Sequence, residues 1–258
     1  MRRVIKIGTS TTLTTDGHID QARLARIAQG VNQLIAGGEQ IALVTSGAVG
    51  IGRGLVSYTQ TNTAGEAMRG ALAAIGQIEL VKAYQLAFSP ISVAQILVDH
   101  GHVSDSSAAM ALQTALHHLW KLESVPLINE NDALSGASRR IGDNDTLAAL
   151  VAGLMKADQL IILSDIDGLY TDNPTTNPDA IRVAVLPRVS LEHFGQFGDG
   201  EPGPWGSGGI VSKLRAAHIA QGFGIETLLA AGHDDTVWEC LRTRRYDNFT
   251  RFAAHKEA

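Results

Sequence analysis

Four short polar segments combine lysine, glycine, hydroxyl and carboxylate groups in a way that suits phosphate chemistry. The first, Lys6-Ile7-Gly8-Thr9-Ser10, sets a positive charge beside a glycine, where the backbone can approach an anion closely. The second, Thr45-Ser46-Gly47-Ala48, is a run of small residues whose backbone N–H groups can form an anion nest. Each segment alone could equally be a strand end followed by an ordinary turn.

The third segment has two parts, Asn129-Glu130-Asn131-Asp132 and Gly142-Asp143-Asn144-Asp145, both of which follow one apolar stretch. Asp143 or Asn144 could cap the helix that begins there. Capping accounts for one acidic residue at this place, but it does not account for so many polar groups beside a buried strand. A functional site is therefore the better interpretation of this segment.

The fourth segment pairs Ser164-Asp165, at the end of an apolar run, with the glycine-rich stretch Gly206–Lys213. The glycine stretch could be a hinge, or it could wrap a nucleotide triphosphate at the N-terminus of the following helix. The sequence contains no G-x-x-x-x-G-K-S/T loop, and no G-x-G-x-x-G follows the first apolar run. A nucleotide site in this protein must therefore be built in another way.

The composition is ordinary for a well-packed globular protein. The chain has 258 residues, 45% of them hydrophobic and 18% charged, with a net charge of −5 and no long basic run. These values argue against dominant disorder and against a nucleic-acid surface as the main function. No apolar stretch is long enough for a membrane helix, and the N-terminus lacks the apolar core of a signal peptide. With one cysteine, Cys240, which we interpret as a packing residue, the chain is expected in the cytoplasm.

Apolar runs alternate with helical patterns from end to end, as expected for elements that place all four segments at one edge of a sheet. The expected strands are Val4–Ile7, Gln40–Thr45, Ile91–Val98, Val125–Ile128, Gln159–Leu163 and Ile225–Ala230. The expected helices follow Asp20 as an N-cap and then cover Ala64–Phe88 (one helix or a broken pair), Ser106–Lys121, Asp145–Lys156 and Val211–Gly222. This order predicts an α/β fold, a three-layer αβα sandwich with a mostly parallel central sheet.

Taken together, the four segments resemble the amino-acid kinase family, and within it the glutamate 5-kinase branch. The pair of segments from Asn129–Asp132 and Gly142–Asp145 is the specific part of the likeness, which extends over essentially the whole chain. The resemblance implies one kinase domain over residues 1–258, with a substrate lobe over about 1–150 and an ATP lobe over about 151–258. Many members carry a further C-terminal PUA domain; we expect this chain to lack it and to be catalytically complete without it. By the resemblance, Asn248–Phe252 would be about the last strand of the kinase domain.

The resemblance also implies roles for individual residues. The catalytic residues would be Lys6, Asp145 and Lys213, with the aspartate holding both lysines in position. The substrate would be bound by Ser46, Asp132 and Asn144. The ATP site would be lined by Lys6, Gly8, Gly47, Ser164, Asp165, Ser207, Gly208, Gly209, Ile210, Val211, Ser212 and Lys213. Mg²⁺ would arrive with the ATP, so no metal ligand from the protein is expected.

The implied reaction is ATP-dependent phosphorylation of the γ-carboxylate of L-glutamate to L-glutamyl 5-phosphate, the first step of proline biosynthesis. A carboxylate needs no general base at neutral pH, and none of the nine histidines lies in the four segments. The alternatives are a kinase of the same fold with another carboxylate or a phosphate as acceptor, and an ATP- or amino-acid-binding sensor without catalysis. A homo-oligomer is expected, with glutamyl-phosphate reductase as a possible associate; neither nucleic acid nor membrane is expected as a partner.

Overall fold

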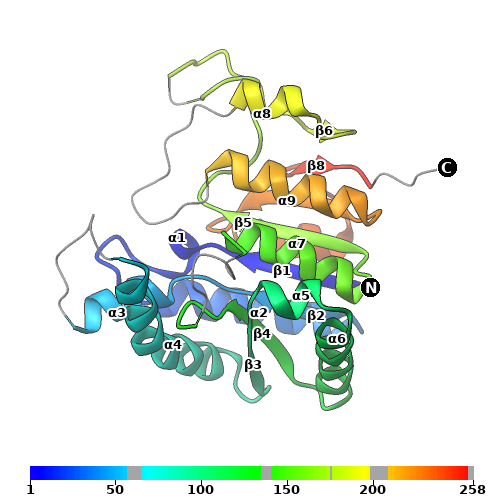
Figure 1. Ribbon diagram of the computed structural model, residues 1–258. Helices are drawn as coiled ribbons and strands as arrows, with labels where there is room; N and C mark the ends of the chain where they lie inside the picture. Colours follow the sequence, from blue (N-terminus) through cyan, green and yellow to red (C-terminus); the bar gives the residue numbers. More distant parts are fainter. Residues whose placement is uncertain (57–64, 135–140, 175, 198–208, 255–258) are drawn as a thin grey trace.

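A central sheet of eight strands with helices on both faces forms the body of the protein (Figure 1). The computed structural model describes residues 1–56, 65–134, 141–174, 176–197 and 209–254. The strand order across the sheet is β3-β4-β2-β1-β5-β7-β8-β6. All neighbouring strands are parallel except β7 and β8, which are antiparallel. The predicted fold class is therefore confirmed.

The strands near the middle of the sheet are short and almost wholly buried, as strands covered on both faces should be. Their bounds are β1 Arg2–Ile7, β2 Gln40–Val44, β3 Val93–Val98, β4 Val125–Glu130, β5 Gln159–Ser164, β6 Val185–Leu186, β7 Glu226–Ala231 and β8 Thr250–Phe252. The six longer predicted strands and the last one are all present, with ends shifted by one or two residues. The two-residue β6 was not predicted.

Helices occupy the connections between strands. Their bounds are α1 Thr9–Thr12, α2 Gln21–Ala36, α3 Ala48–Leu55, α4 Glu66–Phe88, α5 His100–Ser104, α6 Ser106–Lys121, α7 Asn144–Met155, α8 Leu191–Phe197, α9 Ile210–Gly222 and α10 Thr236–Thr243. Asp20 caps α2 as expected, since its side chain accepts from the backbone N–H of Arg23. The stretch ending at Phe88 is one helix rather than a broken pair over its described residues. None of the helices within the described ranges is long and apolar enough to cross a bilayer.

Two hydrophobic cores lie on opposite faces of the sheet. Helices α2, α4 and α10 cover the face onto which Ile5, Leu43 and Ile161 project. Helices α6, α7 and α9 cover the other face, onto which Val4 and Ile162 project. Successive side chains of a strand point to opposite faces, so Lys6 shares the face of Val4 and lies beneath α7 and α9. The alternation along β1 thus decides which helices can contact this lysine.

Glycines permit a close crossing of α3 and α4. A Cβ added at Gly76 of α4 would lie 1.9 Å from the carbonyl oxygen of Ala48, and one added at Gly52 of α3 would lie 2.0 Å from that of Leu72. Both distances are far below any real contact, so only glycine allows the two backbones to meet here. The crossing fixes the start of α3, and with it the turn at Ser46-Gly47, against the middle of α4.

Candidate functional site

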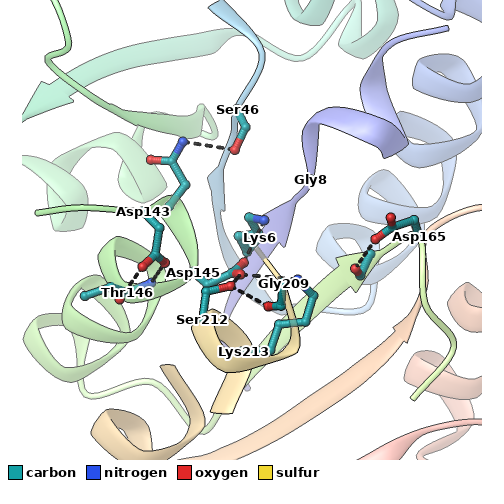
Figure 2. A network of polar contacts seen from close by, with 12 residues as sticks. Lys6, Gly8, Ser46, Asp143, Asp145, Thr146, Asp165, Gly209, Ser212 and Lys213 are labelled. Atoms are coloured by element: carbon teal, nitrogen blue, oxygen red, sulfur yellow. Dashed lines mark hydrogen bonds and ion pairs between the residues drawn. The ribbon is translucent and has the colours of Figure 1, made fainter. Parts of the chain in front are cut away.

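The polar segments meet at the carboxyl edge of the parallel strands, where α/β sheets usually bind ligands. Lys6 lies near the end of β1, Ser46 follows β2, Asn129 and Glu130 end β4, and Ser164 ends β5. The N-termini of α7 and α9 lie at the same edge, as Figure 2 shows for the residues they contribute. The sheet thus brings together segments that are far apart along the chain.

Asp145 joins two buried lysines at the centre of this edge (Figure 2). Its Oδ1 lies 2.6 Å from Nζ of Lys6, and its Oδ2 lies 3.5 Å from Nζ of Lys213. The hydroxyl of Ser212 donates to the same Oδ2 at 2.6 Å. The relative exposure of the three charged residues is 1% for Asp145, 7% for Lys6 and 3% for Lys213. The structure thus brings these three residues together, and their catalytic role stays a prediction.

Burial alone would raise the pKa of the Asp145 carboxyl, because a charged group loses hydration there. The positive charges of Lys6 and Lys213, with hydrogen bonds from Lys6 and Ser212, outweigh burial and hold the pKa well below its usual range. Asp145 is therefore ionised at neutral pH. A depressed pKa of this kind stabilises the fold above the ordinary pKa of an aspartate, and the contribution is lost as the pH falls through the lower folded value.

Helix capping at α7 is performed by Asp143 and not by Asp145. The Asp143 carboxylate accepts from the backbone N–H of Thr146 at 2.7 Å and from its hydroxyl at 3.0 Å. Its Oδ2 also lies 3.6 Å from the guanidinium of Arg215 on α9. Because the cap is already supplied, capping does not explain the buried charge of Asp145.

Two glycines stand at the strand ends of this edge, and one of them, Gly8, leaves space beside Lys6. A Cβ at Gly8 would lie 3.6 Å from Nζ of Lys6 and 3.3 Å from the carbonyl oxygen of Leu163, so it would occupy room next to the ammonium group. Gly47 has a φ of 109°, in the left-handed region that favours glycine, and begins α3 as its N-cap. The backbone N–H of Gly8 donates to the carbonyl oxygen of Leu163 at 3.2 Å, so Gly8 offers space rather than a donor. A glycine turn such as that at Gly47 is suited to a bound anion.

A chain of amide and hydroxyl groups lies beside the charged cluster. The Nδ2 of Asn144 donates to Oγ of Ser46 at 2.9 Å and to Oδ1 of Asn129 at 3.2 Å. The Nδ2 of Asn129 donates in turn to Oε1 of Gln77 at 2.9 Å. The Oδ1 of Asn144 is shielded from solvent and has no hydrogen-bond partner among the residues that the structure describes. This amide therefore presents an open acceptor.

The remaining acidic residues of the third segment support the loop before α7. Glu130 is buried, and its Oε1 accepts from the backbone N–H of Ile141 at 2.7 Å, which anchors the start of the Gly142–Asp145 turn. Asp132 is half-buried, and its backbone lies against Gly70 of α4. The structure thus keeps Asp132 at the same edge as Ser46 and Asn144, nearer to α4.

Most of the residues proposed to bind the nucleotide lie within the described ranges, but two do not. Ser164 donates to Oδ1 of Asp165 at 2.8 Å, and Figure 2 shows Asp165 to the right of the lysine cluster, with Ser46 above the cluster. Gly209 precedes α9, whose first residues Ile210 and Val211 are half-buried and lead to Ser212 and Lys213. Ser207 and Gly208 lie outside the described residues.

Sequence reasoning missed three residues of this site. Asn129 and Glu130 stood in a segment that was singled out, but only Asp132 was assigned a role. Gln77 lies in the middle of a long helix, where no local pattern marks it. Asn129 and Glu130 could have been found from their place at the end of a strand, whereas Gln77 carries no sequence signal of this kind.

A buried pair of lysines held by one carboxylate, at the carboxyl edge of a parallel sheet, is an arrangement suited to offsetting the negative charge of a phosphoryl group. The chain belongs to the amino acid kinase family, whose sequence model matches residues 1–230. Its curated relatives include the glutamate 5-kinase of Moorella thermoacetica, 38% identical over 234 residues, which are 90% of this chain and 61% of that protein. The glutamate 5-kinase of Acaryochloris marina is 38% identical over 89% of this chain and 63% of its own length.

The chain spans about three-fifths of the length of these two relatives, 61% and 63%. A solved structure of isopentenyl phosphate kinase is similar with a TM-score of 0.69 at 18% identity, covering 98% of this chain and all of that one. At that identity the structural likeness supports the fold alone.

Proposed function

We propose that the protein transfers the γ-phosphoryl group of ATP to the γ-carboxylate of L-glutamate, giving L-glutamyl 5-phosphate and ADP. The observation that carries this proposal is the buried Lys6–Asp145–Lys213 cluster beside an array of amide and hydroxyl groups. The names of the relatives agree with it. On this proposal the reaction is the first step of proline biosynthesis.

The chemistry needs alignment rather than proton transfer. A carboxylate oxygen of glutamate attacks the γ-phosphorus, a new O–P bond forms, and the bond from phosphorus to the β,γ-bridging oxygen breaks as ADP leaves. The glutamate carboxylate has a reference pKa of about 4.3 and is already ionised, so no general base is required. Two anions must be held in line and the charge on the moving phosphoryl group must be offset.

Lys6 and Lys213 offset that charge, and Asp145 keeps their ammonium groups close together and correctly aimed. Gly47 would contribute its backbone N–H to the phosphoryl oxygens. The N–H of Gly8 is donated to the carbonyl oxygen of Leu163, so Gly8 contributes space beside Lys6 instead. The space that a Cβ at Gly8 would fill supports the fit of a phosphate group at this place. The nucleotide would lie along Ser164, Asp165 and the stretch from Ser207 to Lys213.

Mg²⁺ would enter bound to the nucleotide phosphates and supply further charge neutralisation. Both oxygens of Asp145 are engaged by Lys6, Lys213 and Ser212, so this carboxylate is not placed to be a metal ligand. A metal carried by ATP is consistent with a site whose charged groups at the phosphoryl position are lysines.

The amino acid would be recognised by Ser46, Asp132 and Asn144. Both N–H bonds of Asn144 are used within the protein, so its amide nitrogen is not placed to donate to a substrate carboxylate. We therefore assign its open Oδ1 to the α-ammonium group, together with the carboxylate of Asp132. Ser46 accepts from Asn144, and its own O–H can donate to a substrate carboxylate.

The two proposed lobes agree with the sheet order. Strands from residues 2–130 form one half, β3-β4-β2-β1, and strands from residues 159–252 form the other half, β5-β7-β8-β6. The boundary runs between β1 and β5, below the lysine cluster. This division supports a substrate lobe over about residues 1–150 and an ATP lobe over about 151–258 within one domain.

Substrate identity is tested by ADP release with a panel of acceptors, with and without hydroxylamine. Glutamate is expected to support ATP- and Mg²⁺-dependent ADP release, and hydroxylamine should trap the acyl phosphate as a hydroxamate. A phosphate acceptor would release ADP without forming a hydroxamate. Turnover of aspartate or N-acetylglutamate with none of glutamate would refute the proposal, and binding of ATP without turnover of any acceptor would favour a sensor.

We also propose that the protein is a homo-oligomer formed through α4 and the β3 edge of the sheet. Met68, Ile75, Ile78 and Leu86 of α4 are 41–74% exposed, although the opposite side of the same helix is packed in the core. A helix that is apolar on both sides is typical of one covered by a second surface. β3 is the terminal strand in the sheet order, and its Leu97 is also exposed.

Light scattering after size exclusion should give a mass of at least two chains for the wild type, and Leu86→Glu should lower it. Leu191→Glu is the matched control, since Leu191 is 88% exposed on α8, away from α4. A wild-type monomer, or equal dissociation by both variants, would contradict this interface. An association with glutamyl-phosphate reductase is a further proposal, supported by the reactivity of an acyl phosphate, which benefits from prompt consumption.

A further inference from the structure

The hydrogen bonds around Asn129 fix the direction of a whole row of amides. The Oδ1 of Asn129 accepts from the backbone N–H of Glu130 at 2.9 Å. A backbone N–H can only donate, so this contact determines which side of the Asn129 amide is oxygen. The Nδ2 of Asn129 must therefore face the other way, toward Gln77, and needs an acceptor there.

Gln77 supplies that acceptor through Oε1, 2.9 Å away. The same oxygen of Asn129 that is bound to Glu130 also accepts from Asn144, so Asn144 must turn its Nδ2 inward. Its Oδ1 is then left facing out of the row, buried and without a partner within the described part of the chain. The backbone N–H of Glu130 thus fixes the orientation of the Asn129 amide, and through it that of the Asn144 amide. Oδ1 of Asn144 is the atom assigned above to the substrate ammonium.

The position of Gln77 is itself determined by the crossing of α3 and α4. Its neighbour Gly76 contacts the backbone of Ala48, two residues after Ser46. Ser46 accepts from Asn144, so the contacts form a closed ring from Ser46 through α3, Gly76, Gln77, Asn129 and Asn144 back to Ser46. Gln77 is the member of this ring that comes from α4.

We propose that Gln77 is a positioning residue for the amine of the acceptor substrate. Acting through Asn129, it holds the Asn144 amide with its oxygen toward the substrate, and so favours an acceptor that carries an ammonium group. The inference rests on the proposed function, because it concerns the amino-acid side of the same site. It assigns Gln77 no contact with the reacting atoms.

The test compares glutamate with glutarate, which has the same two carboxylates but no amine. For wild type and variants, the KM and kcat for glutamate are measured beside the Ki of glutarate as a competitor of glutamate. Gln77→Leu removes the acceptor for Asn129. It should raise the KM for glutamate about tenfold, equivalent to about 1.4 kcal/mol, with kcat and the Ki of glutarate changed less than about twofold. The ratio of the Ki of glutarate to the KM for glutamate, which measures the preference for the amine, should therefore fall by nearly the same factor.

Gln77→Glu is the rescue variant, since a carboxylate oxygen can accept from Asn129 in the same place. Its KM for glutamate should return to within about threefold of wild type. Gln85→Leu is the control on the same helix: Gln85 accepts from the backbone N–H of Val93, away from the site, and its loss should leave the KM unchanged. Thermal melts accompany every variant, and Gln77→Met replaces Gln77→Leu if the latter does not fold.

Three results would overturn the inference: no change of KM in the apolar variant, an equal loss for glutamate and glutarate, or a Gln77→Glu variant as impaired as Gln77→Leu. The last would mean that Nε2 of Gln77 is the important atom. Wild-type protein without ADP release from glutamate would instead refute the proposed function, and the inference with it. Active wild-type protein whose amine preference is insensitive to Gln77 would refute the inference alone.

Discussion

Asp145→Asn is expected to lower kcat for glutamate by at least about a hundredfold, a loss of about 2.7 kcal/mol of transition-state stabilisation. The carboxylate lies between two buried lysines, 2.6 Å from Nζ of Lys6 and 3.5 Å from Nζ of Lys213. An asparagine retains the shape but not the charge, so the two ammonium groups would repel each other and lose their aim. The readout is kcat with saturating glutamate and ATP.

The same change should also lower the melting temperature. Removing one partner of a buried ion pair commonly costs about 3–5 kcal/mol, because a charge is left without compensation. The assay is therefore run well below the melting midpoint of the variant, with circular dichroism to confirm that it is folded. Folded Asp145→Asn protein that turned over within about tenfold of wild type would remove Asp145 from the mechanism.

Asp143→Ala is the matched control for Asp145→Asn. It removes the observed N-cap of α7, two residues away, at a typical cost of about 1 kcal/mol. Its kcat should stay within about threefold of wild type, since Asp143 contacts Thr146 and Arg215 and neither lysine. Loss of stability without loss of turnover in this variant would separate capping from catalysis.

Gly76→Ala is expected to destabilise the protein by at least about 5 °C and to raise the KM for glutamate. By helix propensity alone the change should stabilise α4, because alanine is favoured over glycine by about 1 kcal/mol. The added Cβ, however, would meet the carbonyl oxygen of Ala48 at 1.9 Å and the backbone nitrogen of Gly52 at 2.5 Å. No side-chain rotation relieves a contact with backbone, so α3 and α4 must separate.

Separation would move Ser46 and Gln77 relative to each other, which is why the KM for glutamate should respond while the KM for ATP should not. The control is Gly222→Ala at the end of α9, where an added Cβ meets nothing within 4 Å. Thermal melts and the two KM values are the measurements. A Gly76→Ala variant that melts at or above the wild-type temperature would show that the crossing tolerates a methyl group.

Short apolar runs were sufficient to predict the six longer strands of the sheet, because strands buried on both faces stand out as continuous apolar segments. These runs did not predict α3, whose sequence Ala48–Leu55 contains three glycines and is stabilised by its contact with α4 rather than by propensity. The short helices α5, α8 and α10 were also missed, since five to eight residues give too little periodicity to recognise.

The charged residues of the site could be predicted from the sequence, whereas the amide contacts of Asn129 and Gln77 could not. Lys6, Asp145 and Lys213 stand in motifs that a family resemblance can transfer, and the structure places them together. The role of Gln77 depends on which strand lies opposite α4 and on the direction of the Asn129 amide. Neither follows from spacing, because both are consequences of long-range packing.

The central pairing of the sheet has a consequence for how the protein acquires its activity. β1 pairs with β5, and the contact between Arg3 and Gln159 spans 156 residues of chain. Such a pairing requires closure of a very long loop, and non-local contacts of this kind slow folding. Lys6 is in β1, whereas Lys213 follows β5, so the lysine cluster cannot assemble before that closure. Helices and the local β1–β2 pair can form much earlier, and the chain gains its secondary structure well before it gains a phosphoryl site.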